Sequence, residues 1–369
     1  MATVGDSGAP SSNTVYYDQL LSTTLMAYRK TLVDNIFKDS AFLAYLKLTQ
    51  AWKGQDGGER VAQPLMYGKN QTIKTVGGYE VLDTTPQEGF TTAFMEWAEI
   101  GGTISISRKE ERQNNGEGRL INLLEGKIKQ AEMSMREEMN EQLIVGAVLS
   151  STFVPKLSTE NHLGIAPLGY WFRKLNATDP TRGGNPGNIA SASYAWWRHH
   201  TADLNNQTVT GNDFKFNTST YAGLKAALRR MYNYCARGSG GAPDLVLFDQ
   251  ISFETYENAL DANVRYTNTK MADMGFDTIK LRGATCIWDE KTPDIYTGTA
   301  ALTHGTGFFL NTEFYQLVYD KETDIVTTPF VEPENQTVKT AKILFMGNTI
   351  VTNMRKHGVA YNIPEDIAA

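Results

Sequence analysis

The clearest pattern along the chain is a stripe of apolar residues at helical spacing. It consists of Leu120, Leu124, Ile128, Ala131, Met135, Met139 and Leu143. Steps of three and four residues place these side chains on one face of an α-helix, and charged residues fill the other faces. A helix of about 28 residues would extend roughly 40 Å. The pattern predicts a stiff spine helix with a core face formed by Leu120, Leu124, Ile128, Met135 and Met139.

Two further helices are predicted before this spine. Tyr17, Leu21, Leu25, Tyr28, Leu32 and Ile36 form a second apolar stripe, after a small and polar segment at 1–14. Asp39 and Ser40 are helix-capping residue types. They precede a short apolar run that includes Phe42 and Leu46, which predicts a second, shorter helix there.

Residues 51–96 differ in character from their surroundings. Glycines interrupt short β-like pieces at 61–67 and 79–83, and apolar residues are too sparse to build a core. The pattern predicts a long hairpin that projects from the body. An isolated two-stranded hairpin is marginally stable in water, so this segment is expected to lie on another surface.

The rest of the chain mixes strands and helices. Ile104 and Ile106 alternate with serines, which indicates a half-buried strand. Residues 155–217 are irregular and give no assignment. A helix that Ser219 could cap is predicted from Tyr221 to Met231, with a buried strand after it at 244–248. Asp249 then leads into another helix, and this order suggests an α/β unit.

The C-terminal part is rich in predicted strands. Apolar runs at 343–346 and 349–354 flank Gly347 and Asn348. Glycine at the first central position suits a type II′ turn, so a tight hairpin is expected there.

Composition limits the classes of function. The 369 residues are 41% apolar and 21% charged, which is a globular profile, and the formal net charge is -6. A tight nucleic-acid binder usually has a basic surplus, so this balance favours a protein that lies near DNA without gripping it. Cys235 and Cys286 are 51 positions apart, which argues against a disulfide framework. We expect no membrane segment, because no apolar run approaches about 20 residues.

Motifs for catalysis are missing from the sequence. It contains no GxxxxGK[ST], GxGxxG, HExxH or GxSxG pattern. His199 and His200 are adjacent, so their side chains diverge and rarely share a metal; a role at the surface or in a subunit contact is expected instead. Cys235 ends a predicted helix, where the helix dipole disfavours a thiolate. We expect no catalytic residue, no cofactor and no metal site.

The order of these elements resembles a known family. The stretches DNIFKDSAFLAYLK (34–47), DGGERVAQPLMYGKN (56–70), GGYEVLDTTPQEG (77–89), ISISRKEERQNNGE (104–117) and INLLEGKIKQAEMSMREEMN (121–140) are similar to a recurring signature of the major capsid proteins of tailed double-stranded DNA phages. That family has the Hong Kong 97-type fold, an α+β fold. The match is best over the first 150 residues.

The resemblance implies a division of the chain. Residues 1–50 would form the N-terminal arm and its helices, 51–96 the extended E-loop, and 97–150 the strand and spine helix of the P-domain. Residues 151–325 would form the α/β A-domain with an irregular insertion near 155–217, and 326–369 would return as strands to the P-domain.

The resemblance also implies an assembly function. Copies of the chain would form hexamers and pentamers of an icosahedral shell in the virion, built in the bacterial cytoplasm around DNA that is bound without sequence specificity. The short arm implies a separate scaffolding protein, with a portal and possibly a decoration protein as further partners. Candidate E-loop contacts are Tyr67, Lys69, Asn70, Lys74 and Tyr79.

Two alternatives to these assignments remain open. The prototype of the family crosslinks neighbouring subunits through a lysine and an asparagine. Lys69 or Lys74 could serve here, although loop lysines more often solubilise or pair with carboxylates. The chain could also be another virion component, such as a decoration or tail protein. A β-rich binding protein or carbohydrate-active enzyme is a further reading, because aromatic residues cluster at 194–197.

Overall fold

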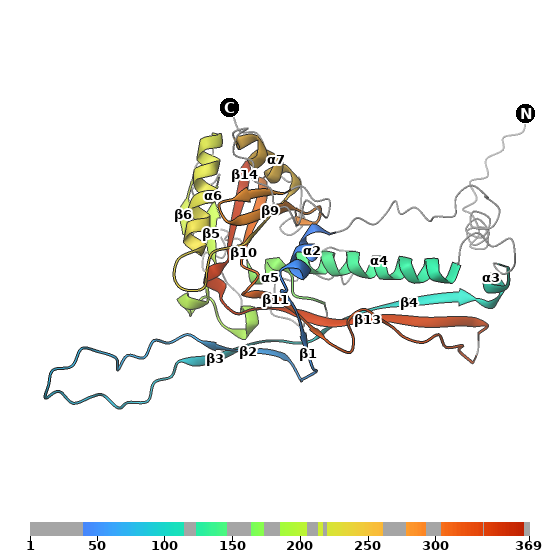
Figure 1. Ribbon diagram of the computed structural model, residues 1–369, viewed down its shortest axis with the longest axis horizontal. Helices are drawn as coiled ribbons and strands as arrows, with labels where there is room; N and C mark the ends of the chain where they lie inside the picture. Colours follow the sequence, from blue (N-terminus) through green and yellow to red (C-terminus); the bar gives the residue numbers. More distant parts are fainter. Residues whose placement is uncertain are drawn as a thin grey trace, which may run out of the picture. The chain divides into compact units, whose positions relative to one another are not determined.

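The computed structural model describes residues 40–113, 123–145, 164–172, 185–204, 213–216, 220–260, 278–292, 304–334 and 336–364. The chain divides into two compact units. Unit 1 comprises residues 1–38, 100–138 and 323–345, and unit 2 comprises residues 39–99, 139–322 and 346–369. The predicted stripe at 17–36 and Leu120 lie outside the described residues. Figure 1 shows the ribbon and the element labels used below.

Unit 1 combines strands with the first part of a long helix. Its elements are β4 (Ala98–Ser107), α3 (Arg108–Gln113), α4 (Leu123–Ile144), β12 (Val326–Thr327) and β13 (Val338–Val351), of which β4, α4 and β13 continue into unit 2. Ile104 and Ile106 are buried and Ser105 between them is exposed, as the alternation predicted. β4 and β12 both pair with β13. The spine helix has 22 described residues.

The expected hairpin turn at Gly347 and Asn348 is wrong, because β13 continues through both residues. In unit 2 they pair with Tyr319 and Val318 of β11 (Tyr315–Asp320). The Asn348 side chain accepts a hydrogen bond from Ala166 N (2.9 Å) and donates one to Glu96 O (2.7 Å). A neighbouring strand and two loops therefore hold the dipeptide extended.

Unit 2 contains a seven-stranded sheet with the order β6-β5-β14-β10-β7-β9-β8. The strands are β5 (His200–Asp203), β6 (Phe214–Lys215), β7 (Leu245–Phe248), β8 (Ile279–Leu281), β9 (Ala284–Trp288), β10 (His304–Leu310) and β14 (Gly358–Pro364). β7 is buried at every position, as the apolar run predicted. Parallel and antiparallel pairs are mixed, which fits an α+β fold.

Two helices pack against this sheet and against each other (Figure 1). α6 (Tyr221–Cys235) buries Leu224, Leu228 and Met231. Its N-cap is Thr220, whose hydroxyl accepts from Gly223 N, so the expectation of a Ser219 cap is wrong by one position. α7 (Gln250–Ala259) is capped by Asp249 as predicted.

Unit 2 also contains elements outside this sheet. They are α2 (Ala41–Leu48), β1 (Trp52–Gln55), β2 (Val61–Met66), β3 (Phe90–Met95), α5 (Leu168–Trp171) and the 3-10 turns η1 (Pro186–Asn188), η2 (Ala195–Trp197) and η4 (Met354–Lys356). Ser40 caps α2 through a hydrogen bond from Leu43 N (3.2 Å), as its residue type predicted. β1 runs parallel to β11.

Candidate functional site

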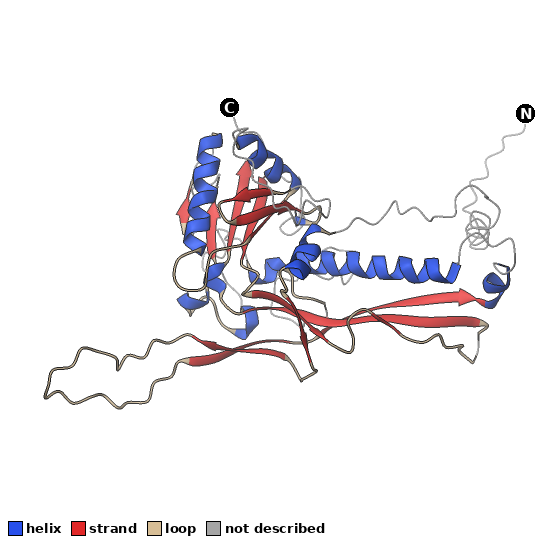
Figure 2. Cartoon of the chain, in the orientation of Figure 1, coloured by secondary structure: helices blue, strands red, loops and turns tan. Residues whose placement is uncertain are grey.

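The predicted hairpin is present, with different strand limits. β2 pairs antiparallel with β3, from Val61 opposite Met95 to Met66 opposite Phe90. Tyr67 N still donates to Gly89 O (2.9 Å), and beyond that bond no strand continues (Figure 2). The expected strand at 79–83 is therefore wrong, because this part of the loop has no partner strand. No residue from 67 to 88 is buried.

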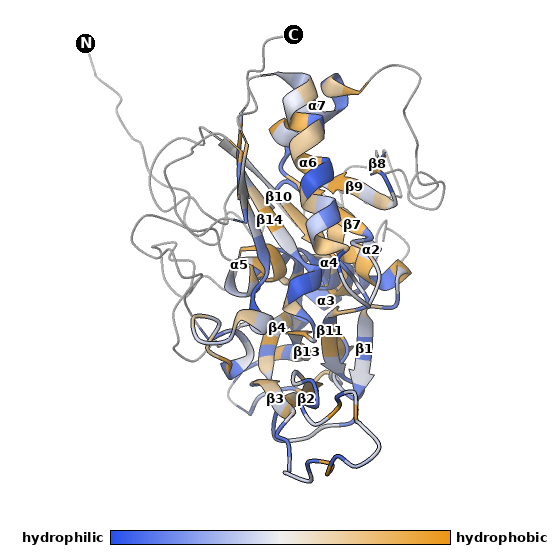
Figure 3. Ribbon diagram, turned by 90° about the vertical axis from the view of Figure 1, so that its left-hand side faces the viewer, coloured by the Kyte–Doolittle hydropathy of each residue, from blue (hydrophilic) through white to orange (hydrophobic). Residues whose placement is uncertain are grey.

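The loop 67–88, which we call the hairpin tip, exposes large apolar side chains. Ile73 is 72% exposed, Val81 87% and Leu82 62%, and Tyr79 is as exposed as in an extended peptide (105%). Figure 3 shows apolar colour at the end of this loop. Scattered exposed apolar residues are common, but several in one projecting loop indicate an interaction surface. Sequence reasoning identified Tyr79 here and missed the three aliphatic residues.

The polar candidates of the hairpin tip make bonds within the loop. Lys74 Nζ lies 2.6 Å from Glu80 Oε1, and this hydrogen-bonded pair lowers the pKa of Glu80. Asn70 Oδ1 accepts hydrogen bonds from the backbone N–H and the hydroxyl of Thr72. Lys69 is exposed. Lys74 and Asn70 thus shape the loop itself, and this favours the ion-pair reading of Lys74 over a crosslink.

Trp196 packs against the base of the hairpin through a contact with Tyr67. The Tyr67 ring stacks on Trp196, with centroids 5.0 Å apart and planes 13° from parallel. Gly187 has φ +63°, and a Cβ there would lie 3.1 Å from the Cβ of Ala93 in β3, so glycine permits the close approach. Trp197 Nε1 donates to a backbone carbonyl of the same segment. These aromatic residues belong to the region 155–217, which the sequence left unassigned. Its signals there were the glycine- and proline-rich segment 183–187 and the adjacent Trp196 and Trp197.

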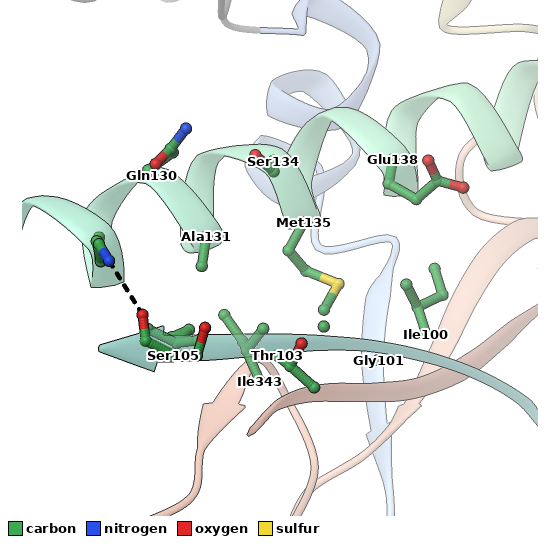
Figure 4. A pocket seen from close by; sticks show the side chains of 13 residues that line it. Ile100, Gly101, Thr103, Ser105, Gln130, Ala131, Ser134, Met135, Glu138 and Ile343 are labelled. Carbon is green, nitrogen blue, oxygen red and sulfur yellow. Dashed lines mark hydrogen bonds between the residues drawn. The ribbon is translucent and has the colours of Figure 1, made fainter. Parts of the chain in front are cut away.

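A groove lies between α4 and β4 within unit 1. It has a volume of about 470 Å³ and is lined by Ile100, Gly101, Gly102, Thr103, Ile104, Ser105, Lys127, Gln130, Ala131, Ser134, Met135, Glu138 and Ile343. Ala131 and Met135 point from the helix towards the strand, and Lys127 Nζ closes one end by donating to Ser105 O (3.1 Å; Figure 4). The space remains because Gly102 of β4 has no side chain and Ala131 of α4 has only a methyl group.

The predicted core stripe of the spine helix is unevenly buried. Within unit 1, Met135 is 4% exposed, whereas Leu124 and Ile128 are half-buried. Met139 belongs to unit 2 and is fully buried. The first turns of α4 therefore keep apolar surface available beside the groove.

Metal-binding clusters and reactive cysteines are absent from the part of the chain that the structure describes. No group of three or more His, Cys, Asp and Glu among the described residues is placed to hold a metal ion. Cys235 and Cys286 are buried, and burial raises the pKa of both thiols, so neither forms a ready thiolate. No helix among these residues has the length and apolarity to cross a bilayer.

The two adjacent histidines have different environments. His199 is 3% exposed and packs edge-on against Phe172, so the expected surface position is wrong for this residue. Its ring fills the core of unit 2 beside an aromatic side chain that the sequence could not place. His200 Nδ1 lies 2.9 Å from Asp213 Oδ2. The two rings therefore have different partners, Phe172 for His199 and Asp213 for His200.

Solved capsid structures resemble this chain over nearly its whole length. The cyanophage A-1(L) capsid asymmetric unit is 13% identical, with a TM-score of 0.59, covering 92% of this chain and 98% of that chain. The capsid of Myoviridae phage XM1 is 10% identical, with a TM-score of 0.54 and coverages of 97% and 100%. The capsid of the native GTA particle is 10% identical, with a TM-score of 0.52 and coverages of 92% and 96%. Neither protein-family models nor curated protein sequences match this chain.

These similarities establish the architecture. The chain has the fold of phage capsid subunits, the Hong Kong 97-type fold. The α+β class expected from the sequence is confirmed.

Proposed function

We propose that this chain is the major capsid protein of a tailed phage and that its copies self-assemble into an icosahedral shell around double-stranded DNA. The fold shared with three capsid chains supports this role. The observation that carries the proposal is the hairpin tip, which exposes Ile73, Tyr79, Val81 and Leu82. A loop with that much uncovered apolar surface is explained by a neighbouring molecule that covers it.

The tip of one copy lies on an adjacent copy. Burying a large apolar side chain contributes roughly 1.5–3 kcal/mol, so a few such side chains give a contact of useful strength. Every subunit both gives and receives such a contact, and the closed shell multiplies a modest affinity. The stack of Tyr67 on Trp196 holds the base of the hairpin, so less conformational entropy is lost when the tip binds.

The α4–β4 groove is a receiving surface of suitable chemistry. Its floor carries Met135 and Ile104, and its volume of about 470 Å³ accommodates a few apolar side chains from another copy.

The wider assembly follows from the family. Copies associate as hexamers and pentamers, with a separate scaffolding protein and a portal, and with a decoration protein as an optional partner. The shell forms in the bacterial cytoplasm and ends in the virion, and the DNA inside is held without sequence specificity. No enzymatic activity is part of the proposal. The proposal also keeps the division of the chain into N-terminal arm, E-loop, P-domain segment, A-domain and returning strands, with limits after residues 50, 96, 150 and 325.

The test removes the tip and leaves the strands. Gly68 and Gly89 face each other across the hairpin, since a Cβ on Gly68 would lie 3.0 Å from Gly89 Cα. Residues 69–88 can thus be replaced by Asn-Gly, which closes a two-residue turn. We expect this variant to fold with unchanged far-UV circular dichroism and to form no shells in negative-stain microscopy. Normal shells from it would overturn the role of the tip.

A second variant tests the groove. Ala131→Trp fills the space between α4 and β4, and we expect it to lower shell yield strongly. Lys129→Trp is the matched control, because Lys129 is exposed and does not line the groove. Equal yields from both variants would show that the groove receives nothing.

A further inference from the structure

A glycine-rich turn follows α6 at residues 237–241, and we call it the glycine turn. All five residues are exposed. Gly238, Gly240 and Gly241 have φ angles of +85°, +107° and +78°, which glycine adopts without strain. Segments rich in glycine and serine behave as flexible coil when nothing holds them. The conformation of this turn therefore depends on contacts with other parts of unit 2.

The backbone carbonyls of the glycine turn converge on the side chain of Lys356. Its Nζ donates to Arg237 O (3.0 Å), Gly238 O (3.2 Å) and Gly241 O (3.0 Å). An ammonium group has three donors, so these bonds use all of them. Lys356 is only 2% exposed. Lysine is almost never buried to this extent without partners, and here the partners are carbonyl oxygens of an exposed turn.

A second side chain holds the carbonyls that Lys356 does not reach. Asn311 Nδ2 donates to Gly240 O (3.3 Å) and to Ala242 O (3.1 Å). The fit around Gly240 is close, because a Cβ there would lie 2.9 Å from Phe314 Cζ and 3.3 Å from Lys356 Cε. Two segments that are distant in the sequence thus grip the turn from its inner side.

Lys356 also supplies positive charge next to the end of a helix. The last turn of α6, which ends at Cys235, contains no basic residue. The C-terminal end of a helix carries partial negative charge and favours a nearby cation. Gly358, two positions after Lys356, packs against the same end, since a Cβ there would lie 2.8 Å from Cys235 Sγ. The ammonium group and the glycine together fix the start of β14 against the end of α6.

We propose that the glycine turn is a binding cage for one primary ammonium group, and that Lys356 supplies this group as a built-in ligand. The cage pins an exposed, glycine-rich loop to the segment that leads into β14. Exposed loop tips with small residues are preferred sites of proteolytic nicking. Trypsin cleaves after arginine, so the bond between Arg237 and Gly238 reports whether the cage is closed. The inference concerns the single subunit and does not depend on shell formation.

The test compares the full chain with and without the ammonium group. Limited trypsin digestion with mass spectrometry measures the rate of cleavage after Arg237, and thermal unfolding gives the Tm. Lys356→Met keeps the length of the side chain and removes its charge. We expect cleavage to become at least about tenfold faster and the Tm to fall by at least about 5 °C, because three carbonyl groups lose their donor. Arg355→Met is the matched control, because the adjacent Arg355 is exposed and the charge change is equal; it should alter neither measurement.

Chemical rescue separates the ammonium group from packing. Lys356→Ala removes three carbons and the nitrogen, so propylammonium ion matches the missing part and 1-propanol is its uncharged counterpart. We expect propylammonium, and not 1-propanol, to slow cleavage after Arg237 and to raise the Tm of this variant. Lack of any preference for propylammonium would overturn the inference, as would cleavage and Tm values of Lys356→Met equal to those of the unaltered chain.

A measurement on the unaltered chain covers the case in which these variants do not fold. Acetylation of amines in the folded chain, followed by mass spectrometry, should modify the exposed Lys69 and spare Lys356. Acetylation of both lysines at similar rates would show that the Lys356 ammonium is free, and the cage would be refuted.

Discussion

Replacing Val81 and Leu82 by serine separates folding from assembly. Both side chains project from the hairpin tip, with 87% and 62% of their surface exposed in the single chain. Their removal therefore takes almost nothing from the folded subunit, and the free energy of unfolding should change by less than about 0.5 kcal/mol. The same side chains are the ones that the proposed contact between copies would bury.

The expected loss in assembly follows from these exposures. Complete burial of one aliphatic side chain contributes roughly 1.5–3 kcal/mol. Scaled by the exposed fractions of Val81 and Leu82, the contact between copies would gain roughly 2–4 kcal/mol from burying the pair. Each 1.4 kcal/mol is a tenfold change in an equilibrium constant. We expect the concentration needed for shell formation to rise by a factor of roughly 30 or more, as the shell requires this contact from every subunit.

The assay is a concentration series followed by light scattering, with negative-stain microscopy of the products. Urea unfolding followed by tryptophan fluorescence reports the stability of the subunit in parallel. Gln71→Ser is the control, because it shortens an exposed polar side chain of the same loop. Unchanged assembly by Val81→Ser/Leu82→Ser would refute the reasoning. A large fall in unfolding free energy would also refute it, since the tip would then be packed against its own subunit.

Three other predictions concern the interior. Met135→Asp places an unpaired charge at a buried position, so it should lower the free energy of unfolding by more than about 3 kcal/mol and give insoluble protein. Ser134→Asp, on the exposed side of the same helix, should stay soluble. A soluble, folded Met135→Asp chain would contradict the core assignment. Burial lowers the pKa of His357 to about 3, so the unfolded chain binds a proton that the folded chain excludes. Stability should fall by up to about 1.4 kcal/mol per pH unit from pH 6.5 towards pH 3. His357→Gln should flatten that slope in urea titrations, and an identical slope would contradict the prediction. Gly305→Ala places a Cβ 1.8 Å from Ser252 Oγ and should lower the unfolding free energy by about 1–3 kcal/mol; an unchanged melting temperature would argue against this packing.

Local signals in the sequence predicted local structure well. Ser40 and Asp249 cap the helices that follow them, because a cap needs only a side-chain oxygen and a backbone N–H three residues later. Ile104 and Ile106 are buried on one side of β4, because side chains in a strand alternate between its two faces. The order of such elements also carried the resemblance to capsid proteins, and with it the fold class.

Tertiary structure decided the features that depend on distant segments. Gly347 and Asn348 have the composition of a turn, yet pairing with β11 keeps them within one strand. The segment 79–83 has the composition of a strand, yet no partner strand reaches it. The contact of Tyr67 with Trp196 joins residues 129 positions apart, and no sequence spacing indicates it. Caps and alternation are set by a few neighbouring residues, whereas pairing and stacking depend on which distant surfaces the folded chain brings together.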